Sequence, residues 1–288
     1  NVLKSFIILC NKTFGKEIFN KKKTFIRTLT NILASWMFTL YSNYNFEGDP
    51  FFPDDFSDTI NLEDTLINFC KFDKQIKDPK IKVDSIIEKL KECYQSNLTE
   101  LNEYKKTDNY LVSSKDYNIN IIEKEFEREG KMTKFYKLLI SHDINLNFNR
   151  LSNIIDNILI PKDIYERLKQ KFTGNYKYFD VYIWIMTYRY QLLGSNNNQL
   201  GVLPQNLLKM KDEYGLNFEL FGSSVNFTLN NYCSLYYDIE KYFGSCGSFF
   251  NYKPEKGVYS FNPPYQSDVI TKGIERLFYF LDKNDNEY

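Results

Sequence analysis

Apolar side chains recur at helical spacing through much of the first two thirds of the chain. One stretch has apolar residues at Val83, Ile86, Ile87, Leu90, Cys93, Tyr94, Leu98 and Leu101. Residues 119–140 and 151–159 also read as amphipathic helices, and Pro161 is placed to begin another helix that Gly174 would end. Sustained alternation of the kind that strands require is not evident. We therefore predict an all-helical domain over residues 1–174.

After Gly174 the pattern changes. Residues 178–193 are apolar on nearly every side, which predicts a buried helix. Beyond it, strands are expected at 217–221 and 257–261, and helices at 204–214, 225–232 and 266–281. Strands that alternate with helices favour a parallel α/β sheet. We therefore predict a second domain, of α/β class, over residues 175–288.

Charge is balanced overall but not along the chain. The sequence has 37 Lys+Arg and 37 Asp+Glu, which excludes a globally basic nucleic-acid binder but allows a local basic patch. The first 45 residues are rich in lysine, and Lys21, Lys22, Lys23 and Arg27 are candidate contacts for RNA phosphates. The alternative for them is the solvated face of a helix. The acidic stretch 46–66 is typical of a loop leading into a helix, and we predict no metal site there.

Histidine and cysteine usage narrows the chemistry further. The only histidine is His142, so a histidine-based triad or a two-histidine zinc site cannot form. The five cysteines are widely spaced and odd in number, which suits a reducing intracellular compartment. No apolar run approaches the roughly 18 residues that a membrane-spanning helix needs, and we predict no membrane association.

The tetrapeptide Asn262-Pro263-Pro264-Tyr265 directly follows a predicted strand and precedes a predicted helix. Ligands of open α/β sheets bind outside the carboxyl ends of the strands. An amine on an aromatic base is a poor nucleophile, and a site that methylates it must accept both N–H bonds. The Asn262 side-chain oxygen and the Pro263 carbonyl can do so, and the prolines hold that carbonyl in place. Tyr265 offers a flat face for a base.

A second segment, Glu219 to Asn226, follows the preceding predicted strand. Its small residues would let the backbone approach a ligand, although it lacks a GxGxxG pattern. Together with the tetrapeptide, it is typical of amino-methyltransferases that use S-adenosylmethionine.

Residues 189–281 resemble the phosphorylated-CTD-interacting-factor family of cap-specific adenosine N6-methyltransferases. The resemblance is carried by Arg189–Gln191, Phe218–Glu219, Phe221–Ser223, Asn226, Asn231–Ser234, Tyr242–Ser245, Gly247 and Ser260–Pro264. It implies a Rossmann-like methyltransferase domain after a helical domain. It also implies methyl transfer from S-adenosylmethionine to N6 of a 2′-O-methylated first adenosine beside an m7G cap.

The same resemblance implies roles for individual residues and a cellular setting. Asn262 and Pro263 would hold the amine, Tyr265 would stack on the adenine, and the residues matched to the cofactor segment are Glu219, Phe221, Ser223 and Asn226. Capped mRNA would be the partner, in the nucleus. The family is named for a WW domain that binds the polymerase tail. Such a domain needs two nearby tryptophans, and here only Trp36 and Trp184 are present.

Two questions stay open at this point. Only 23 residues follow Tyr265 and the chain begins with Asn1, so we expect a fragment or a truncated paralogue whose α/β domain is incomplete. The tetrapeptide also serves methylation of other adenines and of glutamine amides. A catalytically inactive RNA-binding or polymerase-associated paralogue is a further alternative.

Overall fold

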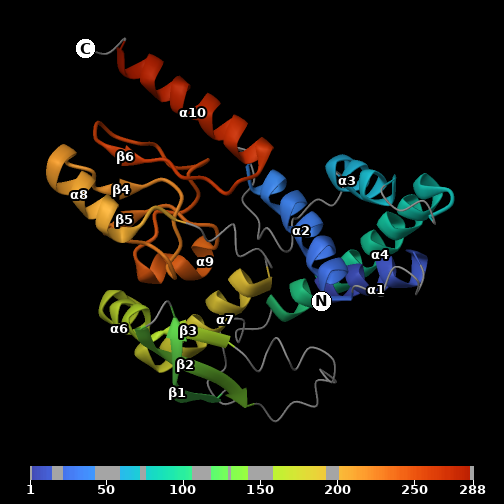
Figure 1. The fold of residues 1–288 in the computed structure, drawn as a ribbon, viewed down its shortest axis with the longest axis horizontal. Helices are drawn as coiled ribbons and strands as arrows, with labels where there is room; N and C mark the ends of the chain where they lie inside the picture. Colours follow the sequence, from blue (N-terminus) through green and yellow to red (C-terminus); the bar gives the residue numbers. More distant parts are fainter. Residues whose placement is uncertain are drawn as a thin grey trace. The chain divides into compact units, whose positions relative to one another are not determined.

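The computed structural model describes residues 2–14, 22–42, 59–71, 76–105, 118–128, 131–141, 158–192 and 201–285 (Figure 1). The chain divides into two compact units. Unit 1 contains Asn1–Asp108, Leu192–Asn198 and Tyr265–Tyr279, and unit 2 contains Asn109–Gln191, Gln199–Pro264 and Phe280–Tyr288.

Unit 1 is built from helices. Its helices α1, α2, α3 and α4 span Val2–Phe14, Lys22–Tyr41, Ile60–Lys71 and Pro79–Lys105, and the start of α10 (Ser267–Asp285) joins them. Fully buried residues at helical spacing form the core: Phe6, Cys10, Leu29, Leu62, Leu66, Val83, Ile86, Leu90 and Tyr94. The helical prediction for this part of the chain is therefore confirmed.

Two side-chain hydrogen bonds join α2 to the start of α10. Ser35 Oγ donates to Gln266 Oε1 at 2.7 Å, and Thr39 Oγ1 donates to Asp268 Oδ2 at 2.9 Å. Asp268 lies in the first turn of α10, where a carboxylate also interacts favourably with the helix dipole.

Unit 2 begins with an antiparallel sheet, and here the all-helical prediction is wrong. Strands β1 (Asn118–Arg128), β2 (Lys131–Ser141) and β3 (Ile158–Pro161) pair in the order β1-β2-β3. The predicted helix over 119–140 is thus a hairpin, and of the predicted helix 151–159 only Ile158 and Leu159 are described, in β3.

The composition of β1 and the cross-strand pairs explain why the hairpin forms. Isoleucines gather at the start of β1, where β-branched side chains favour the extended chain. Pairing brings Lys134 opposite Glu125, so that opposite charges meet across the two strands. The apolar residues of each strand fall at intervals that a helix also produces, so spacing alone could not separate the two structures.

One face of this sheet packs against helix α6 (Lys162–Lys171) and forms a core. Leu138, Ile158 and Ile160 are almost fully buried there, and the Tyr136 ring meets the Tyr165 ring of α6 edge-on at 4.9 Å. Because side chains alternate along a strand, the burial of Ile158 and Ile160 fixes which face of β3 is inward. Helix α6 begins immediately after Pro161, as predicted.

The next two helices also agree with the sequence. Helix α7 (Phe179–Leu192) buries Ile183 and Met186 completely, as its apolar composition predicts. Helix α8 (Pro204–Tyr214) has proline in its first turn and ends at Gly215, whose φ of 72° is the left-handed conformation that glycine adopts most readily.

The second sheet of unit 2 is small and parallel. Strands β4 (Phe218–Glu219), β5 (Asn231–Tyr232) and β6 (Tyr259–Ser260) pair in the order β5-β4-β6. The predicted parallel pairing of the two strands is confirmed, and the fold is mixed α/β. Three strands of two residues do not amount to a Rossmann fold, so that finer assignment is not established.

The helix predicted over 225–232 is absent from this described segment. Asn226 and Phe227 donate their backbone N–H groups to the Ser223 carbonyl, which makes a turn, and the chain then enters β5. A short helix, α9 (Tyr237–Glu240), and a 3-10 turn, Lys241–Phe243, follow instead. The long-range contacts of this loop bury Phe227 and Leu229, and such contacts leave no pattern in the local sequence.

The sheet assignment of residues 131–141 can be tested with two adjacent leucines. Leu138 is 0% exposed, whereas Leu139 points to the opposite face of β2 and is half-buried. We expect Leu138→Ala to lower the free energy of unfolding by about 2–5 kcal/mol and Leu139→Ala to lower it much less, both measured by urea denaturation. Equal losses would contradict the register.

Candidate active site

The two segments singled out by sequence leave the same edge of the parallel sheet. Strand β4 pairs with β6 through Phe218 with Tyr259 and Glu219 with Ser260, and the Leu220 N–H donates to the Ser260 carbonyl at 2.9 Å. Because neighbouring parallel strands end at one edge, the loop after β4 and the Asn262-Pro263-Pro264 segment after β6 begin side by side. That edge is where α/β sheets bind ligands.

Aromatic rings hold these two segments together. The Phe221 ring lies 5.4 Å from the Phe261 ring, nearly perpendicular to it, and 5.1 Å and 5.9 Å from the rings of Phe249 and Phe250. Phe249 and Phe250 are fully buried. Phe221, predicted to contact a cofactor, therefore also fixes the residue that immediately precedes Asn262.

Glu219 closes the loop that follows its own strand. Its Oε1 atom accepts backbone N–H bonds from Thr228 and Leu229, both at 2.7 Å. Burial raises the pKa of the Glu219 carboxyl group, while the two N–H bonds and the charge of Arg167 act in the opposite direction. The described contacts of Glu219 are thus with the protein backbone, and its predicted role toward a cofactor stays a prediction.

Within that loop, Ser223 and Asn226 contact each other. Ser223 Oγ donates to Asn226 Oδ1 at 2.8 Å, and the Asn226 side chain is exposed while Ser223 is buried. Gly222 packs closely on β5, since a Cβ atom at this position would lie 3.2 Å from Cβ of Tyr232. Its small size accommodates this packing within the protein.

A fully buried carboxylate, Glu240, binds the loop after β4 through the backbone of Ser224. It accepts hydrogen bonds from the Tyr190 hydroxyl and the Ser224 N–H, both at 2.6 Å, and from the Tyr236 N–H at 3.0 Å. Burial raises the pKa of the Glu240 carboxyl group, and these hydrogen bonds act in the opposite direction. Sequence reasoning missed Glu240, because one acidic residue in a short amphipathic stretch gives no sign of its burial.

Two cations of α6 approach the same loop. The Arg167 guanidinium lies 4.0 Å from the Phe227 ring centre and Lys171 Nζ lies 4.8 Å from it, while Phe227 stacks on Tyr232 at 4.7 Å. Burial lowers the pKa of both Arg167 and Lys171. Their positions in α6 gave no sequence signal, since they read as the polar side of a helix.

The tetrapeptide itself is accessible. Asn262, Pro263 and Pro264 are half-buried, and Tyr265 is 60% exposed. Tyr265 is the first residue of the segment that belongs to unit 1, whereas the three preceding residues belong to unit 2.

The structure describes little of the remaining residues that the sequence singled out. Lys21 and His142 are outside the described residues, and Lys22, Lys23 and Arg27 lie in α2 with side chains that are not described. Within the described ranges, no cluster of three His, Cys, Asp or Glu side chains could hold a metal ion, and no helix is long and apolar enough to span a bilayer. The five cysteines all lie within the described ranges, and none of them forms a disulfide.

Glu240 generates a prediction about pH. A carboxyl group whose pKa is higher in the folded than in the unfolded protein stabilises the fold most below its unfolded pKa, about 4.3, and this contribution is lost as the pH rises through the folded pKa. Glu240→Gln should therefore weaken the pH dependence of unfolding above that value.

The measurement is urea denaturation between mildly acidic and neutral pH. The Ser224 N–H donates to one oxygen of Glu240, and the Tyr190 hydroxyl and Tyr236 N–H donate to the other. Glutamine replaces one of these oxygens with an NH2 group that cannot accept, so we also expect a loss of about 1–3 kcal/mol at every pH. Glu213→Gln on the exposed side of α8 is the control. An unchanged pH profile in Glu240→Gln would show that Glu240 does not titrate in this way.

Comparison with known proteins finds similarity in the C-terminal part of the chain. The family model described as "Phosphorylated CTD interacting factor 1 WW domain" matches residues 162–288, which begin at α6 and include the parallel sheet and the tetrapeptide. The matched segment contains one tryptophan, Trp184.

Two curated relatives each match about a third of the chain. The mRNA (2′-O-methyladenosine-N(6)-)-methyltransferase of Homo sapiens is 31% identical over 104 residues, which is 33% of this chain and 15% of the relative. The protein of the same description from Mus musculus is 30% identical over 108 residues, 35% of this chain and 15% of the relative. The resemblance expected from the sequence is thus confirmed as a match over part of the chain: residues 162–288 match the family model, and about a third of the chain aligns with the two relatives.

Proposed function

We propose that this chain is part of an S-adenosylmethionine-dependent methyltransferase that acts on N6 of the first transcribed adenosine, 2′-O-methylated, beside the m7G cap of mRNA. One observation carries the proposal. The Asn262-Pro263-Pro264 segment and the 219–226 loop start side by side at the carboxyl edge of one parallel sheet. The activity named for the two relatives supports the choice of substrate. By the same resemblance, we propose a nuclear location and capped mRNA as the partner.

The chemistry assigns a role to each residue of the tetrapeptide. The Asn262 side-chain oxygen and the Pro263 carbonyl accept the two N–H bonds of the exocyclic amine, which favours a pyramidal nitrogen with a localised lone pair. Pro263 and Pro264 restrict the backbone, so the carbonyl is held in advance. Tyr265 presents an exposed ring for stacking on the adenine.

The loop after β4 has the composition to hold the methyl donor. Ser223 and Asn226 supply a hydroxyl and an amide suited to ribose hydroxyls or a carboxylate, and Phe221 supplies an aromatic edge. Glu219 acts in our proposal chiefly by closing the loop on Thr228 and Leu229. When bound, S-adenosylmethionine provides a methyl group activated as a sulfonium, and this chain's residues orient the amine toward it.

Asn262→Ala tests the amine-binding role. Removing one of two acceptors should reduce the methylation rate by about a hundredfold or more, because the lone pair is then held less well in the reactive orientation. Methyl transfer from labelled S-adenosylmethionine is the measurement, and circular dichroism checks the fold. Asn251→Ala, which removes an exposed asparagine elsewhere in unit 2, is the matched control. Retained turnover in Asn262→Ala would reject the assignment.

Substrate choice is tested with capped RNAs that differ in the first nucleotide. We expect labelling of RNA that begins with 2′-O-methyladenosine and none of RNA that begins with guanosine, because guanine has a carbonyl oxygen where adenine has the N6 amine. By the family resemblance, we also expect none of RNA that lacks the cap. Equal labelling of all three would reject the cap-adenosine substrate and favour another adenine or amide. Calorimetry that detects no binding of S-adenosylmethionine would instead favour a catalytically inactive RNA-binding paralogue.

A further inference from the structure

The two faces of the β1–β2 hairpin carry different charged residues. In an antiparallel pair, directly opposite residues share a face, and the register therefore assigns every position. One face, here called the acidic face, has Ile121, Glu123, Glu125 and Glu127 on β1 and Met132, Lys134, Tyr136 and Leu138 on β2. The other, here called the basic face, has Asn120, Ile122, Lys124 and Phe126 on β1 and Thr133, Phe135, Lys137 and Leu139 on β2.

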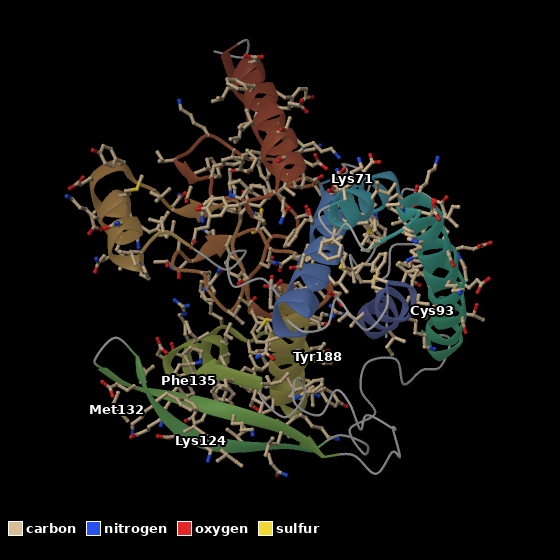
Figure 2. All side chains as sticks on the ribbon, turned by 45° about the vertical axis from the view of Figure 1, so that its right-hand side comes forward. Lys71, Cys93, Lys124, Met132, Phe135 and Tyr188 are labelled. Carbon is tan, nitrogen blue, oxygen red and sulfur yellow. The ribbon has the colours of Figure 1, made fainter. Side chains whose placement is uncertain are left out.

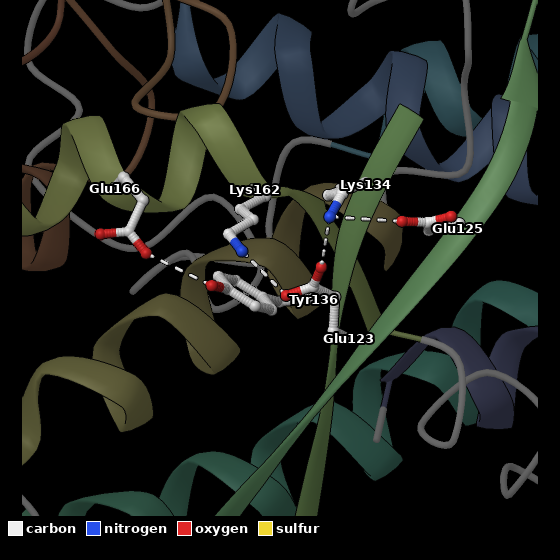
Figure 3. Close-up of polar contacts among 6 residues, drawn as sticks. All are labelled: Glu123, Glu125, Lys134, Tyr136, Lys162 and Glu166. Atoms are coloured by element: carbon white, nitrogen blue, oxygen red, sulfur yellow. Dashed lines mark hydrogen bonds and ion pairs between the residues drawn. The ribbon is translucent and has the colours of Figure 1, made fainter. Parts of the chain in front are cut away.

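Two of the three carboxylates of the acidic face, Glu123 and Glu125, form ion pairs within the fold (Figure 3). Lys134 Nζ lies 3.2 Å from Glu123 and 3.3 Å from Glu125, and Lys162 of α6 donates to Glu123 at 2.8 Å. The Tyr136 hydroxyl donates to Glu166 at 3.4 Å. These contacts hold α6 against the sheet, so this face belongs to the core of unit 2.

The basic face has no carboxylate of its own. Its lysines are Lys124, which is exposed, and Lys137, which is half-buried, and within the described part of the chain neither forms an ion pair. This face of the hairpin therefore presents two lysines and no carboxylate, in a chain whose net charge is zero.

Apolar and aromatic surface lies beside these lysines: Ile122 pairs with Lys137, and Phe126 follows Lys124 along β1 on the side away from Lys137. Phe126 is 44% exposed and Ile122 is 40% exposed, while Phe135 on the neighbouring strand is buried. The Phe126 ring meets the Phe135 ring edge-on at 5.6 Å, which fixes its orientation and leaves part of it open. Figure 2 labels Lys124 and Phe135, which the register pairs directly across the two strands, and Met132 of the acidic face near the turn.

Single-stranded nucleic acid is the ligand that uses both features. Lysines contact the phosphates, and a base stacks on an aromatic ring beside them. An acidic peptide would use the lysines but leave the ring exposed, and a duplex would keep its bases from the ring. We propose that the basic face of the hairpin binds single-stranded RNA. The choice of RNA over DNA rests on the proposed function, whereas the binding chemistry does not.

This surface is separate from the candidate active site. Residues 118–141 precede the segment 162–288 that matches the family, so the comparisons assign no role to the hairpin. It also differs from the Lys21–Arg27 stretch predicted from sequence, which belongs to unit 1, whereas the hairpin belongs to unit 2.

Charge variants test the lysines. Binding of the 288-residue chain to a short labelled oligoadenylate is followed by fluorescence anisotropy at several salt concentrations. Lys124→Gln with Lys137→Gln should weaken binding by about tenfold and reduce the salt slope by roughly 1 to 1.5. The matched control, Lys209→Gln with Lys211→Gln, removes the same charge from exposed positions of α8 and should leave both unchanged.

Tryptophan variants test the ring, and they keep both lysines. Phe126→Trp places a fluorophore on the basic face, and Met132→Trp places one on the acidic face, where Met132 is 64% exposed. The parent chain has two tryptophans, so its fluorescence is subtracted from that of each variant. Oligoadenylate should quench the tryptophan of Phe126→Trp and not that of Met132→Trp. Thermal melts establish that each variant is folded.

Several outcomes would overturn the inference. One is an equal loss of RNA affinity in the two lysine double variants, and another is quenching in both tryptophan variants or in neither. The others are an affinity for duplex RNA equal to that for single-stranded RNA, and displacement of the oligoadenylate by polyglutamate as effectively as by RNA. The last would point to an acidic protein partner. Because these experiments measure binding alone, a chain that binds RNA here without methylating it would reject only the proposed function.

Discussion

The buried carboxylate of Glu240 is the constraint on which the packing of α7 and of the loops around the parallel sheet depends. A fully buried charge is costly unless hydrogen bonds compensate it, and here the compensating donors come from three separate segments. Tyr190 belongs to α7, Ser224 to the loop after β4, and Tyr236 to the turn before α9. These segments must therefore come together at one point, and the parallel sheet is assembled around it.

Packing of the candidate site follows from that junction. The Ser224 hydroxyl bonds to the Tyr232 hydroxyl, which in turn donates to the Phe243 carbonyl, so the loop after β4, β5 and the turn after α9 are connected. Short strands of two residues would be a weak frame by themselves. The hydrogen-bond network and the ring contacts of Phe221 supply the rigidity that the strands lack.

Sequence reasoning succeeded where the determinants are local and failed where they are not. Pro161, Pro204 and Gly215 mark helix ends through their own backbone preferences, and the structure agrees at all three. The strand before Asn262 was also found, because turn residues bound it on both sides. The hairpin was missed, since its apolar spacing also suits a helix and the cross-strand pairs that distinguish it, such as Lys134 with Glu125, join residues that are not neighbours in sequence.

In the candidate site, too, local features were predicted from the sequence and long-range contacts were not. The two motifs were identified from residue types, but their proximity depends on the β4–β6 pairing, which joins residues distant in the chain, such as Glu219 and Ser260. Glu240, Arg167 and Lys171 were missed because each acts on a segment distant in sequence. Long-range contacts of this kind leave no periodic trace in the chain.

The bond pattern of Glu219 has a consequence for the order of assembly. Its partners Thr228 and Leu229 are only 9 and 10 residues away, and loops of this size close in roughly 10–100 ns. The 219–229 loop can therefore form as soon as its own residues are available, whereas β6 must first be synthesised. In a chain made from its N-terminus, the half of the site near β4 takes shape before the half that contains Asn262 exists.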